Sequence, residues 1–167
     1  QWPSTAMRRS DRVIRVDSVT APAWLQGRTI CYRLDYYNRG EMASYSRSQW
    51  AAPVPSMIGQ VVQDVLARSR AWKAVIGPGD DTKATVDLQL HLLNLCQEFS
   101  SPKQSTGALA ARVTVSVAAS GRVIGQRELT YREPAPTPDA AGGVTAERKA
   151  VAKLSSDLAK WVAGLSL

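Results

Sequence analysis

Hydrophobic and polar residues alternate along several stretches of the chain, which is the period-two pattern of a half-buried β-strand. Residues 12–19 and 29–37 predict two such strands, and residues 42–50 predict a shorter third one. In the second strand, Tyr32 and Tyr36 fall in phase with the aliphatic residues, so we expect both rings to point toward the core. The first helical pattern comes only after these three strands.

A helical period begins near Pro53, whose missing N–H donor suits the first turn of a helix. Over residues 57–66, apolar side chains recur three or four positions apart, with polar residues on the opposite side. A second amphipathic helix is expected from Thr145 to about Gly164. Its charged residues, Glu147 among them, are assigned to its polar side.

Four more strands are expected between the two helices. Residues 72–81 indicate a brief strand and a turn, and residues 84–99 carry the longest strand signal of the chain. The apolar phase of this long strand shifts at Leu92 and Leu93, which indicates a β-bulge or a strong twist at that point.

The segment 100–107 is interpreted as a loop, and residues 108–131 as an antiparallel hairpin that turns at Ser120 and Gly121. Residues 132–143 are rich in proline and alanine and are interpreted as an exposed linker before the last helix. A single helix follows this linker, so the linker is not expected to separate two domains.

The expected element order is three strands, a helix, four strands and a helix. Two amphipathic helices can cover one face of a sheet, and an antiparallel sheet tolerates solvent on its other face. We therefore predict an α+β fold, with a largely antiparallel sheet and both helices packed on one face. The opposite face is then wet or used for contacts.

Length and composition fit one globular domain. The chain has 167 residues, 44% of them hydrophobic, which is enough for a single core. No apolar run approaches the roughly 18 residues of a membrane helix. The 21 Lys and Arg residues outnumber the 14 Asp and Glu residues and give a net charge of +7, but they are scattered and form no basic block with interleaved aromatics. We expect a solvated basic surface and no nucleic-acid partner.

No group of residues in the sequence carries a catalytic or metal-binding signature. The single histidine, His91, lies in the long strand in phase with Asp87 and Gln89, and we expect it to face solvent. No serine or cysteine has the motif context of a nucleophile, and two distant cysteines lack the spacing of a zinc site. We therefore expect no enzymatic activity, no metal and no cofactor.

Three aromatic residues, Trp24, Tyr45 and Trp50, lie in connecting segments, where such side chains either close a core or anchor a partner. The two cysteines, Cys31 and Cys96, alternate with polar neighbours, so we expect them to share the less buried face of the sheet. Spacing alone leaves them either as a disulfide or as two free thiols.

The order of several short motifs is more informative than their chemistry. They are a Pro-x-Trp-Leu turn, a Tyr-Arg pair and a Trp-x-x-Pro helix entrance, formed by Pro22, Trp24 and Leu25, by Tyr32 and Arg33, and by Trp50 and Pro53. With the long leucine-rich strand, the small-residue hairpin and a last helix ending in "LAKWV", the chain resembles the ABC-type transport auxiliary lipoprotein family. Lipoproteins of the paraquat-inducible protein C type belong to this family. The resemblance runs from about Arg12 to Val162.

This resemblance implies a Gram-negative periplasmic lipoprotein, anchored by an acylated N-terminus, usually to the outer membrane. Its implied partners are the mammalian-cell-entry (MCE) protein and the permease of a lipid-transporting ABC system. On this interpretation, residues 1–11 are the remnant of the tether and residues 12–167 are one auxiliary lipoprotein domain. Two other classes remain open: a periplasmic lipid or small-molecule carrier, and a nucleic-acid-binding domain.

The resemblance also implies that such subunits can assemble into homo-oligomeric rings. We hypothesise that Trp24 and Leu25, with Tyr45 and Trp50, form part of the contact with the next subunit or with the transporter. The alternative is that Trp24 closes the edge of its own core. In an oxidising periplasm Cys31 and Cys96 could pair, which would stabilise the fold by about 4 kcal/mol in the chain-entropy model.

Overall fold

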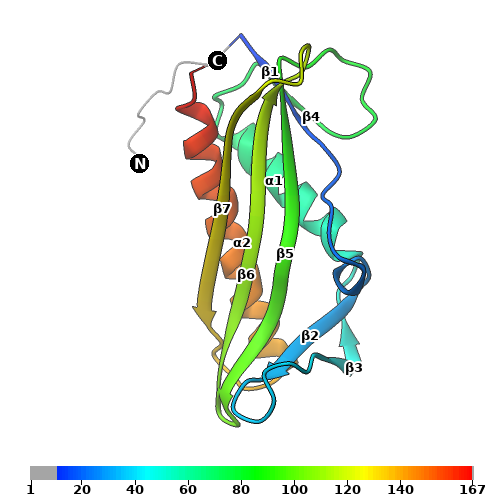
Figure 1. The fold of residues 1–167 in the computed structure, drawn as a ribbon, viewed down its shortest axis with the longest axis vertical. Helices are drawn as coiled ribbons and strands as arrows, with labels where there is room; N and C mark the ends of the chain where they lie inside the picture. Colours follow the sequence, from blue (N-terminus) through cyan, green and yellow to red (C-terminus); the bar gives the residue numbers. More distant parts are fainter. Residues whose placement is uncertain (1–10, 167) are drawn as a thin grey trace.

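The computed structural model describes residues 11–166, which form one sheet and two long helices (Figure 1). The predicted tether, residues 1–11, lies outside the described residues except for Asp11. The expected order of strands and helices is confirmed. In chain order the elements are β1 (Val13–Val16), the short 3-10 helix η1 (Ala23–Leu25), β2 (Thr29–Leu34), β3 (Ala43–Gln49), α1 (Val54–Arg68), β4 (Ala74–Ile76), β5 (Val86–Ser101), β6 (Gln104–Val117), β7 (Val123–Pro134) and α2 (Ala140–Ala163).

Strand β5 is the centre of the sheet. Along one edge it pairs antiparallel with β6, which in turn pairs antiparallel with β7. Its other edge is shared by two short strands: β1 pairs with the first half of β5 and β2 with the second half, both in parallel. Strand β4 lies outside β1, and β3 lies outside β2. The prediction of a largely antiparallel sheet is confirmed, and the parallel pairs are an addition to it.

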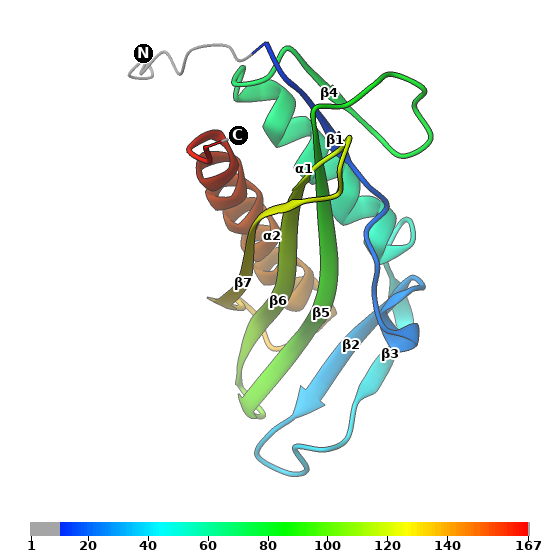
Figure 2. The same cartoon turned by 45° about the horizontal axis from the view of Figure 1, so that its top comes forward.

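Both helices cover the same face of the sheet, as predicted (Figures 1 and 2). Helix α1 buries residues spaced four apart, Ile58, Val62 and Leu66, because this spacing places them on one stripe. Strands β5 and β6 send alternate side chains, such as Leu90 and Val113, into the same core. The opposite face of the sheet carries no helix and presents mostly polar side chains.

The predicted irregularity in the long strand is confirmed. The register between β5 and β6 shifts between Leu92 and Asn94. This bulge moves the inward phase from Leu92 to Leu95 and keeps an apolar or bonded side chain on the helix-covered face along the whole strand.

Two predictions around the strands were wrong. Strand β2 ends at Leu34, so Tyr36 leaves the sheet, lies in a turn and is 48% exposed instead of pointing inward. The expected loop over residues 100–107 is mostly strand, because β5 and β6 continue to a tight turn between Ser101 and Gln104. The small polar residues there fit a narrow hairpin end, which their composition alone does not distinguish from a loop.

The expected linker over residues 132–143 was also partly wrong, since α2 already begins at Ala140. Asp139 caps the helix, and its side chain accepts the N–H of Gly142. Gly143 follows because α2 approaches the sheet closely: a Cβ on Gly143 would lie 2.2 Å from Oε1 of Gln97. The glycines that resembled a linker are therefore packing residues.

Candidate functional site

The Pro-x-Trp-Leu turn forms η1, which is closed by the Leu25 N–H donating to the Pro22 carbonyl over 2.9 Å. The two large side chains of this turn point in different directions. Leu25 is 3% exposed and lies in the core, whereas Trp24 packs at the margin of the core and is partly exposed. The Arg33 guanidinium lies 5.6 Å from the centre of the Trp24 ring. Trp24 therefore joins the turn to β2 through a cation–π contact.

Tyr45 fastens the edge strand β3 to the rest of the molecule. Its ring lies 4.7 Å from the ring of Tyr32, and its hydroxyl donates to Oε1 of Gln97 over 2.8 Å. Gln97 is fully buried, and its amide donates to the Ser105 hydroxyl and to the Asp139 carbonyl. Burial, then the proximity of Tyr32, raises the pKa of Tyr45 to about 12. The hydroxyl therefore stays protonated and acts as a fixed hydrogen-bond donor.

Trp50 closes the connection between β3 and α1. Its backbone N–H donates to the Arg28 carbonyl over 2.7 Å, and its carbonyl accepts from Nε of Arg28 over 3.0 Å. The ring is only 7% exposed. The four residues that the sequence singled out, Trp24, Leu25, Tyr45 and Trp50, therefore do not form one exposed patch.

Trp50 nevertheless reaches the surface through an apolar pocket between the two helices. The pocket has a volume of about 230 Å³. One charged side chain, Arg148, borders it, and no hydrogen bond or ion pair engages Arg148 among residues 11–166. Val61 is 36% exposed there. The pocket is lined by Trp50, Val54, Met57, Ile58, Val61, Leu95, Arg148 and Val151.

The hairpin between β2 and β3 carries a second apolar surface at the lower end of the molecule (Figures 1 and 2). Five large apolar side chains of the described chain are exposed, and three of them, Tyr36, Tyr37 and Met42, belong to this hairpin. We call residues 35–42 the hairpin tip. Sequence analysis missed it because Tyr36 continued the period of the strand and Tyr37 had no pattern of its own.

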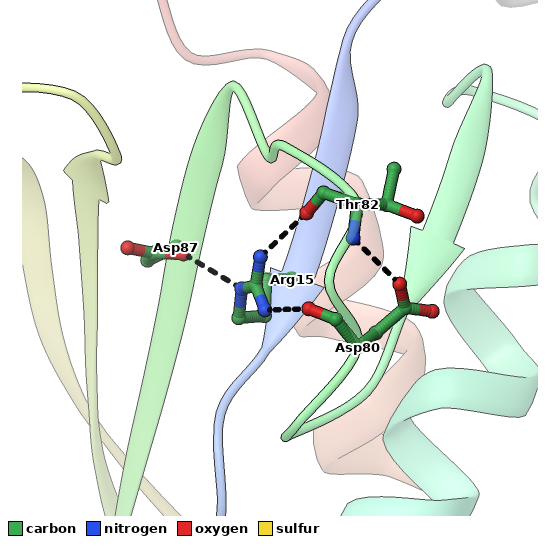
Figure 3. Close-up of polar contacts among 4 residues, drawn as sticks. All are labelled: Arg15, Asp80, Thr82 and Asp87. Atoms are coloured by element: carbon green, nitrogen blue, oxygen red, sulfur yellow. Dashed lines mark hydrogen bonds and ion pairs between the residues drawn. The ribbon is translucent and has the colours of Figure 1, made fainter.

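On the helix-free face, Arg15 holds the loop that connects β4 to β5 (Figure 3). Its guanidinium donates to the carbonyls of Asp80 and Thr82, each over 2.7 Å, and lies 3.6 Å from the carboxylate of Asp87. The Thr82 N–H donates to the Asp80 side chain, and this bond lowers the pKa of Asp80. These charged groups fix a loop, so their arrangement is explained by structure.

Near this cluster, His91 is half-buried and shares a 2.7 Å hydrogen bond with the Thr20 hydroxyl, so it faces the helix-free side but is not fully solvated. Burial and the neighbouring Asp87 raise the pKa of Asp17. No group of three or more His, Cys, Asp or Glu residues in the described part of the chain is placed to hold a metal ion. Within the same residues, neither helix is long and apolar enough to cross a membrane.

Glu147 departs most clearly from its assignment to the polar side of the last helix. It is 1% exposed, and its Oε1 has no hydrogen-bond partner. Burial raises the pKa of Glu147 to about 8. The backbone at Gly107 approaches α2 so closely that a Cβ there would lie 2.8 Å from the Glu147 nitrogen. Neither the burial nor this close contact leaves a signal in the helical period.

Cys31 and Cys96 are joined by a disulfide, which connects β2 to β5. The two residues are 65 positions apart. This covalent link and the Tyr45 hydrogen bond both attach the β2–β3 hairpin to the second half of β5.

Comparison with family models gives one match, to the model described as "ABC-type transport auxiliary lipoprotein component", over residues 2–159. A comparison with curated proteins gives no match.

Among solved structures, protein XCC0632 from Xanthomonas campestris is similar with a TM-score of 0.85 and 18% identity, over 96% of this chain and 88% of that one. The PelC dodecamer from Paraburkholderia phytofirmans is similar with a TM-score of 0.53 and 13% identity, over 92% of each chain. At these identities the likenesses show a shared fold.

Proposed function

Because the chain belongs to the family of ABC-type transport auxiliary lipoprotein components, we propose that it is a periplasmic accessory subunit of an MCE-type lipid transporter. In this proposal it is lipid-anchored, helps to dock the transport complex at the outer membrane, and catalyses no reaction. The observation that carries the proposal is the family match over residues 2–159.

The arrangement of the chain supports a tethered docking role. Asp11 and β1 lie at the upper end of the molecule, and the hairpin tip lies at the lower end (Figure 1). An anchor attached ahead of residue 11 would therefore enter at one end and leave the hairpin tip directed away from it. The disulfide between Cys31 and Cys96 suits an oxidising compartment such as the periplasm.

The contact residues expected from the sequence are retained in a narrower form. Trp24 and Tyr45 are partly exposed, and Trp50 is reached through the apolar pocket. We propose these three as contact residues, with Leu25 supporting Trp24 from inside the core. A homo-oligomeric ring is part of the proposal, and the dodecamer of the similarly folded PelC supports it.

The alternative of a lipid or small-molecule carrier is less well supported by the size of the pocket. Sites that enclose small molecules usually have volumes of roughly 300 to 1,000 Å³. The pocket between the helices has about 230 Å³. It suits a single side chain of a partner better than a whole lipid.

A binding experiment tests the docking proposal. The gene neighbourhood identifies the MCE protein that is encoded beside this chain, and its periplasmic part is immobilised and exposed to the purified chain. We expect saturable binding, and we expect lipid extraction of the purified chain to yield no stoichiometric lipid. Absence of binding together with one bound lipid per chain would replace the docking proposal with the carrier.

A further inference from the structure

We propose that the hairpin tip of one copy of this chain inserts Tyr37 into the apolar pocket between α1 and α2 of the next copy. The inference rests on the proposed homo-oligomer and specifies which two surfaces meet. It requires a projecting apolar group, a pocket that fits it, and matching charges beside both.

Tyr37 is the projecting group. It is 81% exposed, the highest value among the exposed large apolar side chains of residues 11–166. The hairpin tip is held from behind by local bonds: the N–H groups of Tyr37 and Asn38 both donate to the Leu34 carbonyl. An exposed tyrosine on a braced turn loses little conformational entropy on binding, which is the property of an interface anchor.

The pocket has room for one aromatic ring. A cavity of about 150 Å³ lined by aliphatic and aromatic residues is known to accept benzene. The pocket here has about 230 Å³, which leaves space for a ring and its hydroxyl. Trp50 and Leu95 supply the apolar walls expected around a buried anchor, and Met57 is an adaptable side chain at the same site.

Charge complementarity favours a second copy as the occupant. Arg148 borders the pocket and is engaged by no hydrogen bond or ion pair within the described residues. Glu41 lies on the hairpin tip with Tyr37, is exposed, and makes one side-chain contact, accepting from Asn38 over 3.3 Å. Insertion of Tyr37 would bring this carboxylate beside the unpaired guanidinium.

The tip and the pocket are different surfaces of the same chain, so their contact is head-to-tail. Such contacts propagate from copy to copy and close into a ring when the rotation between copies allows it. A variant that lacks one surface can still use the other once, and this property gives a direct test.

The test uses two single variants. Tyr37→Ser removes the projecting ring but leaves the pocket, and Val61→Glu places a charge at the pocket but leaves the tip. Both sites are exposed in the monomer, so both variants are expected to fold. Val123→Glu is the matched control, because Val123 is also an exposed apolar residue but lies at the β6–β7 turn, at the other end of the molecule.

Light scattering after size exclusion should show oligomers for the unaltered chain and for Val123→Glu, and monomers of 18.1 kDa for each single variant. A mixture of the two variants should form a dimer and nothing larger, because it has one intact tip and one intact pocket per pair. A mixture that stays monomeric, or single variants that still assemble, would overturn the inference while leaving the docking proposal intact.

Charge reversal adds an independent measurement. Arg148→Glu and Glu41→Arg should each raise the dissociation concentration of the oligomer at least about tenfold. The double variant restores the pair with opposite polarity and should recover assembly. Failure of this recovery, or an unaltered chain that is monomeric at every concentration, contradicts the contact, and transporter binding then decides the proposed function separately.

Discussion

The two halves of β5 form one continuous strand but are held by different kinds of interaction. In the first half, the helix-facing side chains are all aliphatic, namely Val86, Leu88, Leu90 and Leu92. In the second half, beyond the bulge, Gln97 occupies an inward position and bonds to Tyr45, Ser105 and Asp139. The same half carries the disulfide at Cys96.

This difference separates stability from specificity. Aliphatic packing is non-directional and tolerates exchange of one apolar side chain for another of similar volume. A buried amide with three partners accepts only one arrangement of the elements around it. The second half of β5 therefore fixes where β3 and the start of α2 lie. Both proposed contact surfaces, the hairpin tip and the pocket, depend on those elements.

Removal of the disulfide should give the largest effect on this comparison. The bond closes a segment of 65 residues, and replacing both cysteines with alanine should lower the free energy of unfolding by about 4 kcal/mol. Urea denaturation measures this loss. Hydrogen exchange should accelerate in β2 and β3 and remain slow in the first half of β5.

The internal control is reductant, which should destabilise the unaltered chain and leave the alanine variant unchanged. Uniform acceleration of exchange over the entire sheet would show that the two halves of β5 unfold together and would remove the distinction between them.

A cavity in the first half should be the next largest effect. Leu90 is almost completely buried between the sheet and the helices, so Leu90→Ala should lower the free energy of unfolding by about 3 kcal/mol. Thermal denaturation with and without reductant measures it. The loss should be the same under both conditions, whereas a loss that depends on the disulfide would couple the two halves.

Period and turn chemistry were enough to predict much of the fold. The element order, the single helix-covered face and the bulge near Leu92 all follow from where apolar residues fall along the chain. Each of these depends on local periodicity, which the sequence displays directly. The parallel pairing of β1 and β2 with β5 does not, because pairing partners are set by long-range topology.

The candidate site was less predictable for the same reason. Glu147 and Gly143 have the ordinary sequence signals of a solvated helix side and a linker, yet both lie where α2 contacts the sheet. The pocket combines residues of α1, α2 and β5 that are far apart in sequence. Tyr37 is an anchor only because β2 ends before it, and strand ends are poorly marked by a period of two.

The third prediction concerns the buried carboxyl group beside the second half of β5. The pKa of Glu147 rises from its ordinary 4.5 to about 8 on folding, because burial disfavours the charged form. The unfolded chain therefore releases this proton at lower pH than the folded chain. The destabilisation is absent below about pH 4.5 and grows as the pH rises toward 8.

Glu147→Gln removes this ionisation. The shift corresponds to about 3 kcal/mol at pH 7, and because buried carboxylates relax toward water we expect the variant to be about 2 kcal/mol more stable there. The advantage should vanish near pH 4.5. Denaturation in urea at several pH values measures it, and a constant difference between the two proteins would exclude ionisation of Glu147 as the cause.

The smallest expected effect isolates a single hydrogen bond of the second half. Tyr45→Phe keeps the ring against Tyr32 but deletes the hydroxyl that donates to Gln97, which leaves a buried amide oxygen without this partner. Such a loss should lower the free energy of unfolding by about 1 kcal/mol. Tyr37→Phe is the matched control, because Tyr37 is exposed and its hydroxyl has no partner within the described chain, so its stability should not change. Since Tyr45 holds the edge strand β3, its loss should also speed hydrogen exchange in β3 before it affects β6. Equal stability of the two phenylalanine variants would mean that water replaces the Tyr45 hydroxyl, and the specificity assigned to the second half of β5 would then rest on the disulfide and on the remaining bonds of Gln97.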